Sequence, residues 1–146
     1  MAASALLYRL YERRLMGTLG STTLPRHIGV MLDGNRRWAK ELGRNAAFGH
    51  ERGADKINEF LTWCGEVGVQ VVTLWLLSTD NLKRAREEID ALLQIIAGAV
   101  ERLAEAHQWR LKMVGNLQML PQEFVSRLEK AESSTADVKG MQVNIA

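Results

Sequence analysis

Residues 27–38, His-Ile-Gly-Val-Met-Leu-Asp-Gly-Asn-Arg-Arg-Trp, decide the fold of this chain. A short apolar run stops at Asp33, and a Gly-Asn pair, two arginines and a tryptophan follow in a helical pattern. A strand, a turn and a helix in this order open a parallel β–α–β unit, in which ligands bind beyond the carboxyl ends of the strands. There Asp33 suits a hard cation such as Mg²⁺, and Arg36 and Arg37 suit phosphate oxygens. The alternative is an ordinary turn in which Asp33 caps the helix that begins near Gly34.

Three further apolar runs alternate with helical patterns along the chain. The runs are Val69–Leu77, Arg110–Val114 and Met141–Ala146. Between them, apolar residues recur at helical spacing over 57–67 and 89–103, and Pro121 with Glu123 predicts another helix start. The alternation predicts an α/β fold, a parallel β-sheet core with crossover helices.

The N-terminal segment has a different composition. Residues 5–16 predict an amphipathic helix with Leu7, Leu10 and Tyr11 on one side, followed by a Gly/Ser/Thr linker. We favour docking of this helix on its own domain or on a partner subunit; the alternative is peripheral contact with a membrane surface. We therefore divide the chain into a helix and linker (1–23) and one domain (24–146).

Bulk properties bound the class of protein. The chain has 146 residues, is 47% hydrophobic and carries a net charge of +2, which indicates one globular domain and does not predict nucleic-acid binding. Seven basic and four acidic residues lie between Leu24 and Lys56, around the candidate site. The single cysteine, Cys64, excludes an intramolecular disulfide and falls on an apolar helical stripe. Apolar runs of transmembrane length are absent, so a cytoplasmic protein is the simplest interpretation.

Four motifs resemble one known family, the cis-prenyltransferases or undecaprenyl diphosphate synthases. The Asp-Gly-Asn-Arg-Arg-Trp segment is followed in the family's order by Phe48-Gly49-His50, Ser78-Thr79-Asp80-Asn81 and Val143-Asn144-Ile145-Ala146. The resemblance covers about residues 24–146, and the N-terminal Leu-Tyr-Arg-Leu-Tyr-Glu-Arg stretch is similar to actinobacterial short-chain members. Family members continue well beyond Asn-Ile-Ala, so we expect this chain to be a C-terminally truncated form.

The resemblance implies an activity. Members condense isopentenyl diphosphate with an allylic diphosphate, such as geranyl diphosphate, and form a Z-prenyl diphosphate. Departure of the allylic diphosphate is assisted by Mg²⁺, the isopentenyl double bond attacks the resulting carbocation, and a proton is lost. A homodimer is implied for the full-length protein. The rival interpretation is a catalytically silent homologue or a partner subunit of a prenyltransferase.

The resemblance also assigns roles to residues. Asp33 is the acid that handles metal and diphosphate, and Asn81 matches a residue proposed as proton acceptor, although a neutral amide is a weak base and could instead position the diphosphate. The substrate-binding positions are Gly34, Asn35, Arg36, Arg37, Trp38, His50, Ser78, Thr79, Asp80 and Arg84. Trp38 is equally consistent with packing. The stretch from Ser78 to Arg84 is also consistent with a helix cap followed by a solvated Lys-Arg pair.

Two positions depart from the family's motifs, and one bulky residue bears on the predicted product length. Ala46 stands where the family often has a phosphate-binding arginine, which Arg44 could replace, and Asp80 stands where a glutamate is usual. In the family, a small residue after the aromatic of the second strand leaves room for long products. Here Leu76 follows Trp75, so we predict a short-chain product.

Overall fold

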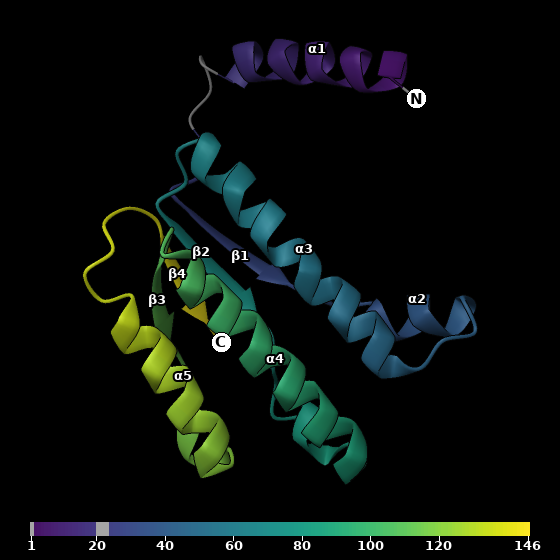
Figure 1. Ribbon diagram of the computed structural model, residues 1–146, viewed down its shortest axis with the longest axis vertical. Helices are drawn as coiled ribbons and strands as arrows, with labels where there is room; N and C mark the ends of the chain where they lie inside the picture. Colours follow the sequence, from purple (N-terminus) through teal and green to yellow (C-terminus); the bar gives the residue numbers. More distant parts are fainter. Residues whose placement is uncertain (1, 20–23) are drawn as a thin grey trace.

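A four-stranded parallel sheet forms the centre of the computed structural model, which describes residues 2–19 and 24–146 (Figure 1). The strands lie in the order β1-β2-β4-β3. Their bounds are β1 (His27–Met31), β2 (Val71–Trp75), β3 (Arg110–Met113) and β4 (Gln142–Ile145). The helices are α1 (Ala2–Leu19), α2 (Asn35–Glu41), α3 (Ala46–Glu66), α4 (Arg86–Ala106) and α5 (Gln122–Ser134), with 3₁₀ turns η1 (Asn81–Lys83) and η2 (Leu117–Met119). The predicted α/β fold is confirmed.

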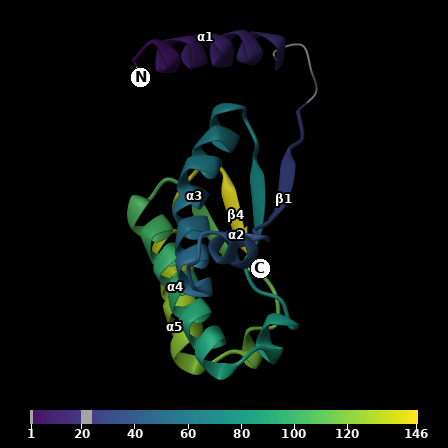
Figure 2. The same ribbon diagram turned by 90° about the vertical axis from the view of Figure 1, so that its right-hand side faces the viewer.

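Side-chain alternation along the strands gives the sheet one buried face. Val72 of β2 pairs in register with Val143 of β4, which pairs with Leu111 of β3, and all three are fully buried. Helices α3, α4 and α5 lie on this side of the sheet (Figure 2). Cys64 of α3 is buried in the same core, as its place on an apolar stripe predicted.

The opposite face of the sheet carries a row of hydrogen-bonded polar side chains. His27 Nε2 lies 2.8 Å from Thr73 Oγ1, and Asn144 donates to the same hydroxyl at 3.0 Å. Gln142 in turn donates to Asn144, and Arg110 donates to Gln142. The row links all four strands. It gives this face a polar character that is unusual for a parallel sheet, whose two faces are normally both apolar.

The carboxyl ends of β1 and β2 lie side by side and place two loops at one edge of the sheet. β1 pairs with β2 in parallel, with Met31 opposite Trp75. The chain leaves β1 through Gly34, whose φ of 87° is in the left-handed region that favours glycine. Gly34 is the N-cap of α2 and no side chain caps this helix, so the alternative in which Asp33 serves only as its cap is wrong.

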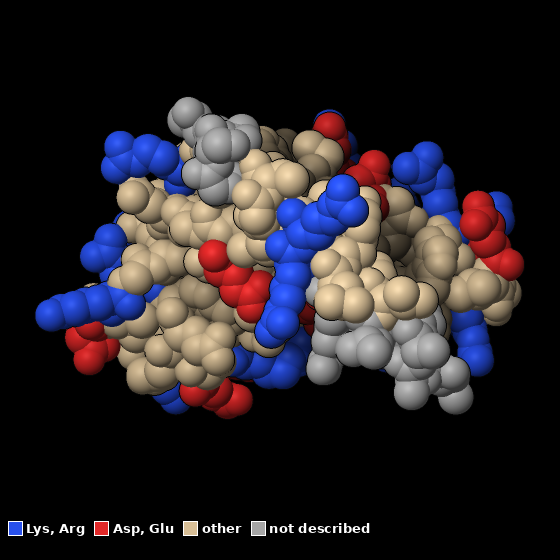
Figure 3. All heavy atoms as spheres, turned by 90° about the horizontal axis from the view of Figure 1, so that it is seen from above, with Lys and Arg blue, Asp and Glu red and all other residues tan. Residues whose placement is uncertain are grey.

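The N-terminal helix is longer than predicted, and none of its described side chains is buried against the domain. The described side chains of α1, among them Leu7, Leu10 and Tyr11, are exposed. The helix extends through Leu19, so the first part of the predicted linker is helical, and residues 20–23 lie outside the described residues. Among the described helices, none is both long and apolar enough to cross a bilayer. Basic and acidic side chains are interspersed on the face seen in Figure 3.

Candidate active site

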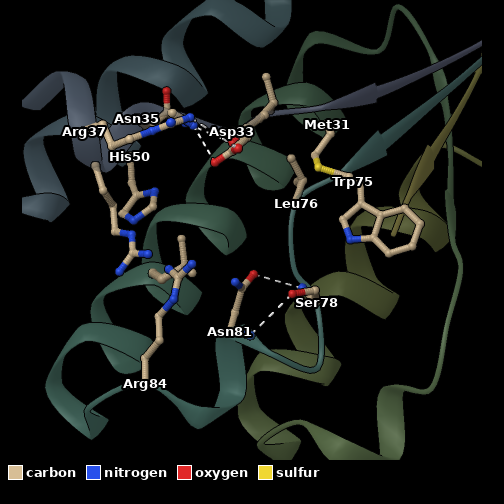
Figure 4. A pocket seen from close by; sticks show the side chains of 14 residues that line it. Met31, Asp33, Asn35, Arg37, His50, Trp75, Leu76, Ser78, Asn81 and Arg84 are labelled. Atoms are coloured by element: carbon tan, nitrogen blue, oxygen red, sulfur yellow. Dashed lines mark hydrogen bonds and ion pairs between the residues drawn. The ribbon is translucent and has the colours of Figure 1, made fainter.

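A polar pocket of about 320 Å³ opens at the carboxyl ends of β1 and β2 (Figure 4). It brings together most of the site residues expected from the sequence, although the first and the last of them are 51 positions apart along the chain. These are Asp33, Gly34, Asn35, Arg36, Arg37, His50, Leu76, Ser78, Asn81 and Arg84. Met31, Trp75, Leu32 and Leu92 complete the lining. The topology thus places the β1 loop and the β2 loop around one hollow.

Asp33 presents an exposed carboxylate to this pocket. Its Oδ1 accepts a hydrogen bond from the Gly34 backbone N–H at 2.6 Å, and its Oδ2 lies 3.7 Å from Arg37 Nη2. Both side chains are largely exposed, 76% for Asp33 and 81% for Arg37, so this ion pair is weak and easily exchanged for a ligand. Among the described residues, His, Cys, Asp and Glu form no group of three or more that could hold a metal by themselves. A single carboxylate fits Mg²⁺ bound jointly with phosphate oxygens and water, the usual mode for this ion.

Two further arginines converge on the pocket and share one carboxylate. Arg36 at the start of α2 and Arg84 just before α4 each place Nη1 3.2 Å from Glu88 Oε1. Arg84 is 20% exposed, whereas Arg36 is 52% exposed. Together with Arg37, they give the pocket three guanidinium groups, whose planar forks match phosphate oxygens.

His50 closes the inner side of the pocket from helix α3. Burial lowers its pKa most, the positive charges of Arg84 and Arg36 lower it further, and Glu88 opposes them. The imidazole is therefore neutral at neutral pH. Its Nε2 is buried without a hydrogen-bond partner among the described residues, and the ring and Arg84 point toward each other (Figure 4). A buried polar atom left unpaired in a pocket is available to a ligand.

Ser78 and Asn81 form a reciprocal hydrogen-bonded turn after β2. Asn81 Oδ1 accepts from the Ser78 backbone N–H at 2.9 Å, and Ser78 Oγ accepts from the Asn81 backbone N–H at 3.3 Å. Because Oδ1 is already engaged, the Asn81 side chain offers its NH₂ group to a ligand. The alternative interpretation of this stretch, a helix cap with a solvated Lys-Arg pair, is not supported: Asp80 makes no capping bond to η1, and Arg84 is mostly buried, although Lys83 is exposed.

Asn35 packs closely against α3 at two glycines of that helix. A Cβ atom on Gly53 would lie 2.5 Å from Asn35 Nδ2, and one on Gly49 would lie 2.9 Å from the Asn35 backbone carbon. The amide also donates to the Leu32 carbonyl at 3.3 Å. The close approach of α2 to α3 therefore depends on two positions without side chains, spaced one helical turn apart.

Three of the expected site residues lie outside the polar pocket. Trp38 stacks on Phe48 with ring centroids 5.9 Å apart, Thr79 lines a neighbouring apolar pocket, and exposed Asp80 pairs with Lys83 at 2.7 Å. Arg44, the suggested substitute for the family arginine at position 46, does not line the pocket either. Its guanidinium lies over the Phe48 ring, 5.4 Å from the centroid.

Two apolar spaces adjoin the polar pocket. The first, which we call the apolar pocket, has a volume of about 370 Å³ and extends between α4, α5 and the ends of β2 and β4. The small cavity, about 40 Å³, lies between α3 and α4 and is shared at its mouth by His50, Asn35 and Leu92. Leu76 lines all three spaces. One side chain therefore marks the boundary between charged and hydrocarbon surroundings.

Comparison with known proteins identifies the family of this chain. A family model described as "Putative undecaprenyl diphosphate synthase" matches residues 31–146. The chain belongs to the cis-prenyltransferase family. As a member, it is 53% identical over 141 residues to isoprenyl transferase 1 of Streptomyces avermitilis and 50% identical over 141 residues to a (2Z,6E)-farnesyl diphosphate synthase of Thermobifida fusca. These alignments cover 97% and 96% of this chain and 55% of each relative.

A solved structure of a diphosphate synthase has a similar fold. Lavandulyl diphosphate synthase from Lavandula x intermedia, crystallised with dimethylallyl diphosphate, is 27% identical and superposes with a TM-score of 0.78. The match covers 84% of this chain and 54% of that one. The chain thus spans about half the length of the relatives it matches. The family and fold expected from the four motifs are confirmed.

The sequence did not single out Glu88, Gly49 or Gly53 as site residues, although they contact residues of the pocket. Glu88 follows Arg84 by four positions, a helical ion-pair spacing that could have drawn attention to it. Gly49 and Gly53 have the same spacing and could have indicated a close helix contact. The shared contact of Glu88 with Arg36 spans 52 residues, and the sequence gives no local signal for it.

Proposed function

We propose that the intact protein transfers prenyl groups: it condenses isopentenyl diphosphate with an allylic diphosphate to form a short-chain Z-prenyl diphosphate. The observation that carries this proposal is the junction of a pocket with three arginines and two apolar spaces. An amphiphile with a diphosphate head and a hydrocarbon tail fits such a junction.

The residues of the polar pocket have distinct roles in this proposal. Arg36, Arg37 and Arg84 bind diphosphate oxygens, and the buried Nε2 of His50 hydrogen-bonds another. When bound, Mg²⁺ would neutralise charge on the departing diphosphate, and Asp33 would hold it together with the phosphates. The C–O bond of the allylic diphosphate breaks and a C–C bond to isopentenyl diphosphate forms.

Asn81 positions the diphosphate in this mechanism. Its side-chain oxygen is engaged by Ser78, and an amide has no basic nitrogen, so the leaving diphosphate is the better acceptor for the released proton. Gly34 lets the ligand approach the backbone, and Asn35 donates from the wall opposite. Trp38, Thr79 and Asp80 stay predictions as substrate contacts, because they lie outside the polar pocket.

Product length is set in this proposal by Leu76. The small cavity beyond it holds about 40 Å³, too little for a long prenyl chain, and the Thermobifida fusca relative is named a (2Z,6E)-farnesyl diphosphate synthase. We also propose a homodimer for the intact protein and a cytoplasmic location, with α1 as the segment that could contact a membrane surface.

The test is an extension assay with an internal control. The chain is incubated with labelled isopentenyl diphosphate, geranyl diphosphate and Mg²⁺, and extended product is measured. Asp33→Asn should lower turnover by roughly a hundredfold or more, because it removes the metal-binding charge. Asp55→Asn, an exposed carboxylate of α3 paired with Arg52, should leave turnover unchanged. Absence of turnover both in this chain and in a chain extended to the length of its relatives would support the silent-homologue interpretation instead.

A further inference from the structure

Glu88 occupies a position from which it can arrange the polar pocket without entering it. It lies in the first turn of α4 and is not part of the pocket lining, whereas both of its partners, Arg36 and Arg84, are. We propose that Glu88 is a positioning residue that fixes these two guanidinium groups for a diphosphate. The inference rests on the proposed function.

The geometry is that of a shared acceptor. One oxygen, Oε1, lies 3.2 Å from Nη1 of Arg36 and 3.2 Å from Nη1 of Arg84. The two arginines come from different loops, one after β1 and one after β2, so the carboxylate joins the two halves of the pocket. Without this carboxylate, two positive groups would face each other and would separate by repulsion.

Burial distinguishes this contact from the other ion pairs near the site. The Glu88 side chain is 28% exposed and Arg84 is 20% exposed, so the pair is only partly screened by water. The neighbouring Arg86–Asp90 pair on the same helix is 3.7 Å long, with side chains 92% and 60% exposed. An exposed pair of this kind contributes little. Asp90 therefore provides a matched control on the same helix, two residues farther along.

A competing explanation is that Glu88 merely opposes the ligand's negative charge. Under that explanation, removal of the charge tightens diphosphate binding, and Glu88→Asp, which retains the charge, changes nothing. Positioning predicts the reverse. A side chain shorter by one methylene cannot reach both guanidinium groups, so Glu88→Asp weakens binding although the net charge is the same.

The experiment measures binding of inorganic diphosphate to the full 146-residue chain by calorimetry in metal-free buffer at fixed ionic strength. We expect Kd to rise about fivefold in Glu88→Asp and about tenfold in Glu88→Gln, the lower end of what outer-shell partners contribute at other sites. Asp90→Glu and Asp90→Asn should stay within about twofold of the unmutated chain. Thermal unfolding of each variant shows whether it is folded, and Glu88→Asp decides the question if Glu88→Gln does not fold.

A second readout reports on the local charge independently of binding. Because Glu88 raises the pKa of His50 against the two arginines, Glu88→Gln should lower the His50 pKa measured by NMR, and Asp90→Asn should not. Diphosphate binding that is unchanged or tighter in the Glu88 variants would overturn the positioning role while leaving the proposed function intact. Failure of the unmutated chain to bind diphosphate would refute both.

Discussion

Three glycines on helix α3 test whether the site depends on close packing of this helix against Asn35. A Cβ on Gly65 meets nothing within 4 Å, and one on Gly53 meets the Asn35 amide at 2.5 Å. One on Gly49 would overlap the Asn35 backbone carbonyl oxygen and would lie 2.9 Å from the carbonyl carbon and 3.0 Å from Ala39 Cβ. The three Gly→Ala substitutions therefore add the same methyl group to one helix. They differ only in what that methyl group displaces.

The expected stabilities follow from these contacts. Gly65→Ala should raise the free energy of unfolding by up to about 1 kcal/mol, because alanine favours the helix and restricts the unfolded chain. At Gly53 the obstacle is the end of a flexible side chain, which must retreat by about 1 Å to a normal contact distance. The helix gain offsets this displacement, so Gly53→Ala should stay within about 1 kcal/mol of the unmutated chain. Gly49→Ala displaces backbone and should cost about 1–3 kcal/mol or more.

Ligand binding separates Gly53 from the other two positions. Displacement of the Asn35 amide removes a hydrogen bond to a charged ligand, so the Kd for inorganic diphosphate should rise about tenfold in Gly53→Ala. Gly65→Ala should bind as the unmutated chain does. Urea unfolding followed by circular dichroism gives the stabilities, and calorimetry gives the affinities. Unchanged diphosphate binding by a folded Gly53→Ala variant would refute the role of Asn35, and a Gly49→Ala variant as stable as Gly65→Ala would refute the packing of α2 on α3.

Two further predictions concern the apolar boundary and the buried imidazole. Leu76→Ala in the intact enzyme should lengthen the products, because it joins the small cavity to its neighbours; chromatography of labelled products measures this, and unchanged lengths would contradict it. Because burial and Arg84 lower the pKa of His50, the unfolded chain binds more protons below about pH 6.5, so the free energy of unfolding should fall as the pH drops through the folded-state pKa. Urea unfolding at several pH values should show a smaller decrease in His50→Gln; an identical decrease would contradict this.

Local sequence rules predicted the framework because each element carries its own signal. The β-branched run before Trp75 forms β2, and Pro121 is the N-cap of α5 as its pairing with Glu123 indicated. The pocket was also foreseeable, because parallel strands bring the residues that follow them to one edge. Arg37 and Asn81 both line this pocket because the topology brings the β1 and β2 loops to the same edge.

The sequence did not predict which of several neighbours a charged side chain contacts in the folded protein. Asp80 binds Lys83 and stays outside the pocket, and Arg44 lies over Phe48 and does not reach the site. Motif matching assigns a role to a position, whereas the partner that a side chain selects depends on what packs beside it. The shared contacts of Glu88 belong to the same class, since one partner is four residues away and the other is 52.

The end of β2 explains why charge and hydrocarbon meet at one point. Leu74 is fully buried under the helices, and the next side chain, Trp75, is half exposed on the other side of the sheet, as strand alternation requires. Leu76 follows where the strand has ended, so it projects into the gap between the loops and contacts all three spaces. Two residues later, Ser78 begins the polar turn with Asn81. The change from core to pocket thus takes place within four residues, and under the proposed function a head group bound by the arginines would direct its tail past Leu76.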